Sequence, residues 1–194
     1  MQAETRIEIV EALLGGWWYP PNAALVRRDA FVSVGGCDTT LGNTCEDFDL
    51  WLKLGMAGFR FGYVPGHFAN YYRYLRIRSM SRVSGREFFE GEAAIILRAV
   101  RQLEAEKMDT MARRSAAARR LHAVARNAFG IDNAWYQDLM KEIRSLDPQF
   151  RPTGTLPYRI AERWLGGEAA ERLASWTRRM IRRRRRPLSE RSKR

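Results

Sequence analysis

The amino-acid composition and the spacing of apolar residues change at Arg82, and this change constrains the fold more than any other feature of the sequence. From Trp17 to Arg82 the sequence is dense in glycine, proline and aromatic residues, with short apolar runs at 23–26 and 59–64 that favour β-strands. After Arg82 glycine and proline thin out, and apolar residues recur at helical spacing. The sequence therefore predicts mixed α/β material followed by a helical part.

Helices are expected wherever an apolar stripe is bounded by glycine, proline or aspartate. In the first half these are residues 4–14, which end at Gly15-Gly16, and a short, mostly buried helix over 47–56. In the second half, breaks at 130–132 and 147–157 predict three or four helices. The last of them is expected from about Tyr158 to Arg186, with an interruption at Gly166-Gly167.

The composition excludes several classes of protein. With 45% hydrophobic and 11% aromatic residues the chain is too apolar to be disordered, and it has no uncharged apolar run long enough to span a membrane. Two cysteines, Cys37 and Cys45, are too few for a disulfide framework or a cysteine-based zinc site. The N-terminal residues lack the pattern of a signal peptide, so we expect a cytoplasmic protein.

The net charge of +12 is concentrated at the C-terminus. Residues 1–97 carry a net charge of −1, whereas residues 172–194 carry eleven basic side chains and one acidic side chain. Apolar residues recur at helical spacing among these arginines: Leu173, Trp176, Met180 and Ile181. A basic amphipathic helix of this kind suits the interface of an anionic membrane, here the inner face. A docked helix with a solvated arginine end and non-specific nucleic-acid binding are the alternatives; no motif indicates a specific nucleic-acid partner.

Three carboxylates, Glu46, Asp47 and Asp49, stand at the start of the helix predicted over 47–56. A helix N-terminus favours acidic residues, because they cap free N–H groups and complement the helix dipole. One cap needs only one carboxylate, and three close together repel one another unless a substrate hydroxyl, a cation or an arginine shares the site. The cluster is therefore both a structural feature and a candidate functional site.

Further blocks flank this cluster in a fixed order. They are Asn22 to Phe31, Val34 to Asp38, Glu46 to Leu52, Gly58 to Pro65, and Tyr71-Tyr72-Arg73 with Ser79 to Arg82. Their order and spacing resemble the C-terminal half of the catalytic domain of family-2 glycosyltransferases, which have the GT-A fold. The resemblance covers about a third of the chain. It implies an inverting transferase that uses a nucleotide-sugar donor and a glycan or lipid-linked acceptor, as in polysaccharide biosynthesis.

The resemblance also implies roles for individual residues. Asp47 matches the general base of the family, and Glu46 would be a second catalytic residue that orients the acceptor hydroxyls. The substrate-binding candidates are Asp49, Trp51 and Arg73. Each has a structural alternative: Asp49 as a helix cap, Trp51 as a core residue, and Arg73 in an internal salt bridge.

The chain departs from the family pattern upstream. Family members carry a Rossmann-like half whose Asp-x-Asp motif holds a divalent metal on the nucleotide, but only sixteen residues precede Trp17 and they contain no such motif. We expect Mg²⁺ or Mn²⁺ in a complete enzyme, with no ligands in this chain. The expectation is a fragment that is inactive alone or pairs with another polypeptide, and that self-associates through an exposed sheet edge.

The sequence thus predicts an α/β fold: a partial GT-A (Rossmann-like) domain that lacks its nucleotide-binding half, followed by an α-helical C-terminal extension. The expected divisions are residues 1–85 for the acceptor-side half, 86–186 for the helical extension and 187–194 for a basic disordered tail. The predicted function is glycosyl transfer. The alternative is a noncatalytic remnant or adaptor that binds a partner protein or a membrane surface through its basic helices.

Overall fold

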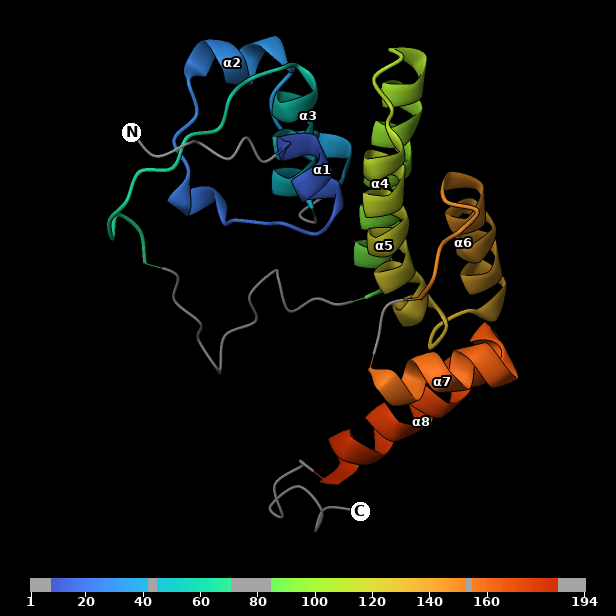
Figure 1. The fold of residues 1–194 in the computed structure, drawn as a ribbon. Helices are drawn as coiled ribbons and strands as arrows, with labels where there is room; N and C mark the ends of the chain where they lie inside the picture. The colour runs from blue at the N-terminus through green and yellow to red at the C-terminus, as the bar shows by residue number, and fades with distance from the viewer. Residues whose placement is uncertain (1–7, 42–44, 71–84, 153–154, 185–194) are drawn as a thin grey trace.

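A computed structural model describes residues 8–41, 45–70, 85–152 and 155–184, and every regular element within these ranges is helical (Figure 1). The α-helices are α1 (Ile9–Leu14), α2 (Arg28–Ser33), α3 (Glu46–Met56), α4 (Arg86–Ala105), α5 (Met111–Ala128), α6 (Asn133–Leu146), α7 (Leu156–Leu165) and α8 (Gly167–Arg184). Two short 3₁₀ helices, η1 (Pro21–Ala23) and η2 (Thr39–Leu41), lie between them.

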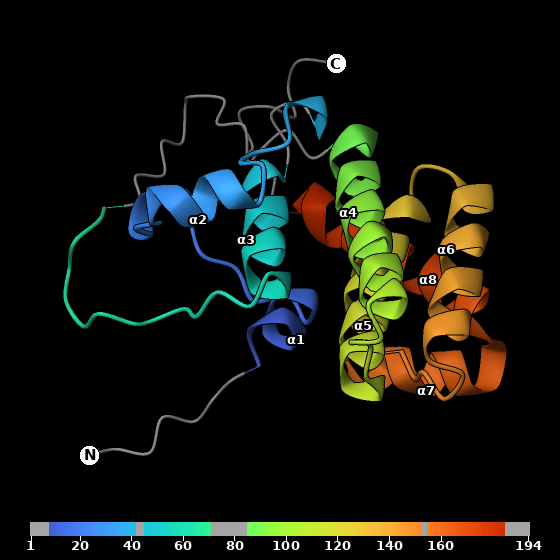
Figure 2. The same ribbon diagram turned by 90° about the horizontal axis from the view of Figure 1, so that it is seen from above.

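Helix α5 is the centre of the structure, because α1, α4 and α6 all pack against it (Figures 1 and 2). Its sequence explains how three helices can approach one helix. The small side chains of Ala116, Ala117, Ala118, Ala125 and Ala128 are all buried, and they let neighbouring backbones come close. The longer side chains of this core come from α5 itself, such as Leu121, and from α3, α4 and α6, such as Phe48, Ile96 and Ile143.

Helix α3 is held against the rest of this core through α1 and α4. Its apolar residues, Phe48, Leu50, Trp51, Leu52 and Leu54, are all buried. At Gly55 the two short helices approach closely: a Cβ there would lie 3.2 Å from Cγ2 of Val10 and 3.3 Å from Cγ2 of Ile9. The start of α3, which carries the acidic cluster, is therefore part of the folded body.

Helices α7 and α8 form an antiparallel hairpin across one end of the bundle (Figure 1). Arg126 of α5 anchors both helices. Its guanidinium lies 4.5 Å from the ring centroid of the buried Tyr158 on α7, and its Nε donates to Oε1 of Glu171 on α8 at 2.7 Å. Glu171 is fully buried, so this ion pair ties the hairpin to the core.

The predicted α/β fold, a partial GT-A (Rossmann-like) domain, is wrong, because the described residues contain no strand or sheet. The two runs predicted as strands lie largely in irregular structure. In the first run, Ala23 is the last residue of η1, the residues after it have no regular structure, and Leu25 is fully exposed. In the second run, residues 59–64 have no regular structure, and Tyr63 and Val64 are exposed. Aromatic and β-branched residues favour a strand only where a neighbouring strand pairs with it, and no described segment pairs with these two.

Several of the predicted helices are present in the structure, whereas the predicted strands are not. Helices α1 and α3 coincide with the described parts of 4–14 and 47–56, and Gly166, at φ +83°, separates α7 from α8 as expected. The described residues after Arg82 form five helices rather than three or four. The turn between α4 and α5 was missed, because it has neither glycine nor proline; Lys107 itself takes the left-handed conformation, at φ 56°. The domain boundaries stay a prediction, and residues 187–194 lie outside the described part.

Candidate functional site

The acidic cluster occupies the first turn of α3, as predicted. The chain enters this helix through Cys45, which has a left-handed backbone (φ 64°) and makes no side-chain cap. The Cys45 thiol is half-buried and lies 3.9 Å from the carbonyl oxygen of Phe88. Burial, together with the negative charges of Glu92 and Asp47, raises the pKa of this thiol to about 12. Cys45 is therefore a protonated packing residue, unsuited to act as a nucleophile at neutral pH.

Asp47 lies half-buried at the surface end of this turn, and two donors hold its carboxylate. The indole Nε1–H of Trp18 donates to Oδ2 at 2.9 Å, and the backbone N–H of Phe48 donates to Oδ1 at 2.7 Å. Each carboxylate oxygen has a second lone pair, so both keep capacity to accept another hydrogen bond. The carboxylate is thus fixed in orientation while it remains able to take a proton.

The aromatic segment beside Asp47 begins where α1 ends. Gly16, at φ +103°, turns the chain after α1, and the N–H of Trp17 then donates to the carbonyl oxygen of Ala12 at 2.9 Å. This turn brings Trp18 to the start of α3. The rings of Trp17 and Trp18 are about half exposed, at 51% and 45%. An exposed tryptophan offers both apolar ring surface and a polar N–H, so this segment can contact a ligand that has apolar and polar parts.

Glu46, the second predicted catalytic residue, is half-buried in the same turn. Its side chain makes no hydrogen bond or ion pair with any residue in the described ranges. Asp47 and Glu46 are therefore brought together at the surface, as neighbours in one helical turn. Their predicted roles stay predictions.

Asp49 takes a different position, because it is buried within the protein, with 2% of its surface exposed. Its Oδ1 accepts from Arg98 of α4, and its Oδ2 lies 2.8 Å from Nζ of Lys53. Arg98 also reaches Oδ2 of Asp38 at 3.2 Å, and Lys53 donates to the carbonyl oxygen of Gly36 at 3.3 Å. This network joins α3, α4 and the turn before η2, so in this structure Asp49 ties elements together and does not face solvent.

Asp38 belongs to the same network. Hydrogen bonds from the hydroxyl and backbone N–H of Thr40, together with Arg98, lower the pKa of its carboxyl to about 2. Asp38 is therefore ionised at neutral and mildly acidic pH, and it keeps a negative charge beside Arg98.

Trp51 lies in the core below the aromatic segment, with 3% of its surface exposed. Its ring packs on Tyr19, with centroids 4.7 Å apart, and Tyr19 in turn contacts Phe61 and Trp17 edge-on. Burial raises the pKa of the Tyr19 hydroxyl well above its usual value. Trp51 thus supports the segment that carries Trp18 from beneath and offers no free face to a ligand. The remaining candidate, Arg73, lies outside the described residues.

The residues described do not fit a divalent metal ion. No group of three or more histidine, cysteine, aspartate or glutamate side chains in the described ranges is arranged to hold one. Asp47 and Asp49 resemble an Asp-x-Asp pair in sequence only, because Asp49 is buried between two cations. We therefore derive no step through a metal at this site.

Sequence reasoning missed two residues of this site, Trp18 and Arg98. A buried carboxylate needs a cation, so the cluster itself signalled an arginine or lysine. Nothing in the sequence selected Arg98 among 34 basic residues. Trp18 stood in a conspicuous aromatic segment, but its partner, 29 residues further along the chain, was not predictable without the packing of α1 on α3.

Comparisons with known proteins give one match of interest. Over 62 residues the chain is 42% identical to WbbL, a rhamnosyltransferase of Escherichia coli strain K12; the match covers 32% of this chain and 24% of that protein. The chain therefore shares a segment with a glycosyltransferase, and it spans about a quarter of that enzyme's length. No protein-family model matches the chain, and no solved structure matches it.

Proposed function

We propose that this chain supplies the acceptor-binding and base groups of an inverting glycosyltransferase. The similarity to a rhamnosyltransferase is the observation that carries the proposal, and the geometry of Asp47 supports it. A rhamnosyl group on a nucleoside diphosphate is accordingly the first donor to test. The acceptor would be a glycan or a lipid-linked glycan, and a lipid-linked acceptor would place the chain on the inner face of a membrane.

In this proposal Asp47 acts as the general base. A sugar hydroxyl is a weak nucleophile, and a carboxylate within hydrogen-bond reach removes its proton as the oxygen attacks. The acceptor oxygen forms a bond to the anomeric carbon, the bond from that carbon to the diphosphate oxygen breaks, and the nucleoside diphosphate leaves with the electron pair. The proton remains on Asp47. Attack from the face opposite the leaving group inverts the configuration.

Trp18 and Glu46 would position the reactants in this scheme. The hydrogen bond from Trp18 holds the Asp47 carboxylate in one orientation, and the exposed faces of Trp17 and Trp18 are available to the acceptor ring. Glu46, one residue before the base, would accept hydrogen bonds from the remaining acceptor hydroxyls. The groups that bind the donor lie outside this proposal and would come from a partner or from further sequence.

The decisive experiment measures the transfer of radiolabelled rhamnose from its nucleoside diphosphate to lipid-extracted acceptors in lysates of cells that produce the full chain. Asp47→Asn removes the base at nearly constant shape, and we expect a loss of about 100-fold or more. Trp18→Phe removes only the hydrogen bond to Asp47, so we expect a smaller loss. Asp138→Asn changes an exposed aspartate on α6 and is the matched control, with unchanged activity expected.

Two outcomes would contradict the proposal in different ways. Unchanged transfer by Asp47→Asn would show that another group is the base. Equal transfer in lysates with and without the chain would remove the enzymatic function and leave the adaptor hypothesis.

A further inference from the structure

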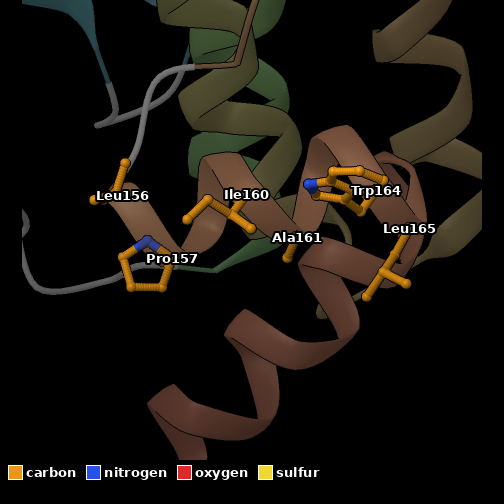
Figure 3. Close-up of a pocket in the computed structure, with 6 residues that line it drawn as sticks. All are labelled: Leu156, Pro157, Ile160, Ala161, Trp164 and Leu165. Atoms are coloured by element: carbon orange, nitrogen blue, oxygen red, sulfur yellow. The ribbon is translucent and has the colours of Figure 1, made fainter.

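One side of α7 presents an apolar surface to solvent. Leu156, Ile160 and Trp164 follow one another at intervals of four residues along this side, and they are 67%, 51% and 79% exposed. Figure 3 shows them together on the outer side of the helix. The apolar surface forms a shallow hollow lined by Leu156, Pro157, Ile160, Ala161, Trp164 and Leu165.

The apolar side of α7 is exposed although the helix itself is packed on the core through its other side. The opposite side of α7 carries Tyr158, whose ring packs on Arg126 at 4.5 Å and near His122 at 6.4 Å. Burial and the neighbouring Glu171 carboxylate raise the pKa of the Tyr158 hydroxyl well above its usual value. The core therefore takes one side of α7 and leaves the apolar side uncovered.

Positive charge borders the apolar side. Arg159 and Arg163 are exposed on α7, one helical turn apart, and they precede Ile160 and Trp164 directly in the sequence. The neighbouring helix α8 exposes Leu173, Trp176 and Arg172. Over residues 155–184, which form the hairpin, the sequence carries eight basic and three acidic side chains. The hairpin thus combines exposed tryptophan and aliphatic side chains with a strong local excess of cations.

We propose that the apolar side of α7 is a membrane-binding surface whose partner is an anionic lipid bilayer. In this arrangement α7 lies in the plane of the interface, Ile160 and Trp164 insert among the acyl chains, and Arg159 and Arg163 contact lipid phosphates. Helix α7 has ten residues, about half the length needed to cross a bilayer, so it can only lie in the plane of the interface. None of the described helices combines the length and the hydropathy of a membrane span. This inference does not depend on the proposed function.

The arginines beside the apolar side favour a bilayer over a second copy of the chain or a nucleic acid as the partner of this surface. In a face-to-face dimer of two α7 helices, the arginines that border the apolar side would be brought toward those of the second copy and repel them. A nucleic acid would satisfy the arginines, but it would leave the exposed Ile160 and Trp164 without an apolar environment. An anionic membrane satisfies both, because its phosphates and acyl chains lie within one helix diameter of each other.

The test is co-sedimentation of the full chain with phosphatidylcholine vesicles that contain or lack phosphatidylglycerol. We expect binding to the anionic vesicles and weak binding to the neutral ones. The double variant Ile160→Gln/Trp164→Gln keeps the charge and should lower the partition coefficient by about tenfold or more. Arg159→Gln/Arg163→Gln keeps the apolar side and should lower the partition coefficient by about 25-fold, since each interfacial arginine contributes about fivefold.

Leu25→Gln is the matched control, because Leu25 is a fully exposed apolar residue far from α7 in sequence, and its replacement should leave binding unchanged. All the substituted side chains are exposed, so circular dichroism should show unchanged folding. Brominated lipids should quench Trp164 fluorescence in the parent protein, and Trp164→Phe should remove that quenched component.

Several results would overturn the inference. If Ile160→Gln/Trp164→Gln binds anionic vesicles as well as the parent protein, the arginine tail alone attaches the chain and α7 has no part. Binding that a nucleic-acid duplex abolishes, without any tryptophan quenching by brominated lipid, would indicate a nucleic-acid surface. A stable dimer in gel filtration that dissociates on Ile160→Gln and never binds vesicles would show that a second copy covers α7.

Discussion

Arg98→Met tests the interpretation that Asp49 is a structural residue. Asp49 has 3% of its side chain exposed and is neutralised by Arg98 and Lys53. Removal of Arg98 leaves the buried carboxylate with Lys53 alone and also removes the link to Asp38. Loss of one partner of a fully buried ion pair costs about 3 to 5 kcal/mol.

The expected cost here lies below that range, because Arg98 is 48% exposed and Lys53 remains in place. We expect the free energy of unfolding to fall by about 2 kcal/mol. For a chain of this length that loss lowers the melting temperature by about 4 to 8 °C. Asp49→Asn should cost a similar amount, and the double variant should show a coupling energy of about 1 to 2 kcal/mol.

Urea denaturation followed by circular dichroism at the helical band measures these energies. Arg101→Met is the control, since Arg101 is exposed on the same helix and has no ion pair in the described part of the chain. Its effect should stay within about 0.5 kcal/mol. Additive effects of Arg98→Met and Asp49→Asn would refute the ion pair. A stable Asp49→Asn protein that had lost only acceptor binding would restore Asp49 as a substrate-binding residue.

Two further predictions follow from shifted pKa values. Burial and the nearby Arg126 lower the pKa of His122 from 6.5 to about 4, so the unfolded chain takes up this proton first. Stability is complete above about pH 6.5 and falls by about 3 kcal/mol as the pH drops to about 4. His122→Leu should flatten that part of a plot of melting temperature against pH, and an unchanged slope would contradict the burial of His122. The Cys45 thiol, with its pKa near 12, should react with Ellman's reagent only after denaturation, whereas the exposed Cys37 reacts at once; two fast thiols in the native protein would show that α3 opens readily.

The fold could be predicted from the sequence only where local pattern determines structure. Helices α1 and α3 have apolar stripes with glycine near their ends, and the end of α1 and both ends of α3 were predicted close to their observed positions. The segment at 59–64 has the composition of a strand, but a strand also needs a partner, and the composition of a segment does not show whether one exists. The central position of α5 was equally hidden, because five of the eight buried residues of α5 are alanines, which a search for large apolar residues overlooks.

In the candidate site, too, the local features could be predicted from the sequence and the long-range contacts could not. The acidic cluster and its place at a helix start were visible in the sequence, because they are local features. The partners that give each carboxylate its environment, Trp18 for Asp47 and Arg98 for Asp49, are 29 and 49 residues away in the chain. Such long-range partners follow from the packing of α1 and α4 on α3.

The helical geometry of α3 nevertheless separates the roles of Asp47 and Asp49. Successive residues of an α-helix are rotated by about 100°, so residues two apart point about 200° apart, to nearly opposite sides. The carboxylates of Asp47 and Asp49 therefore point in nearly opposite directions and meet different surroundings. The structure places Asp49 in the core between two cations and Asp47 at the surface with Trp18. A ligand that approaches from solvent can therefore meet Asp47 and Glu46, and it cannot be held jointly by Asp47 and Asp49.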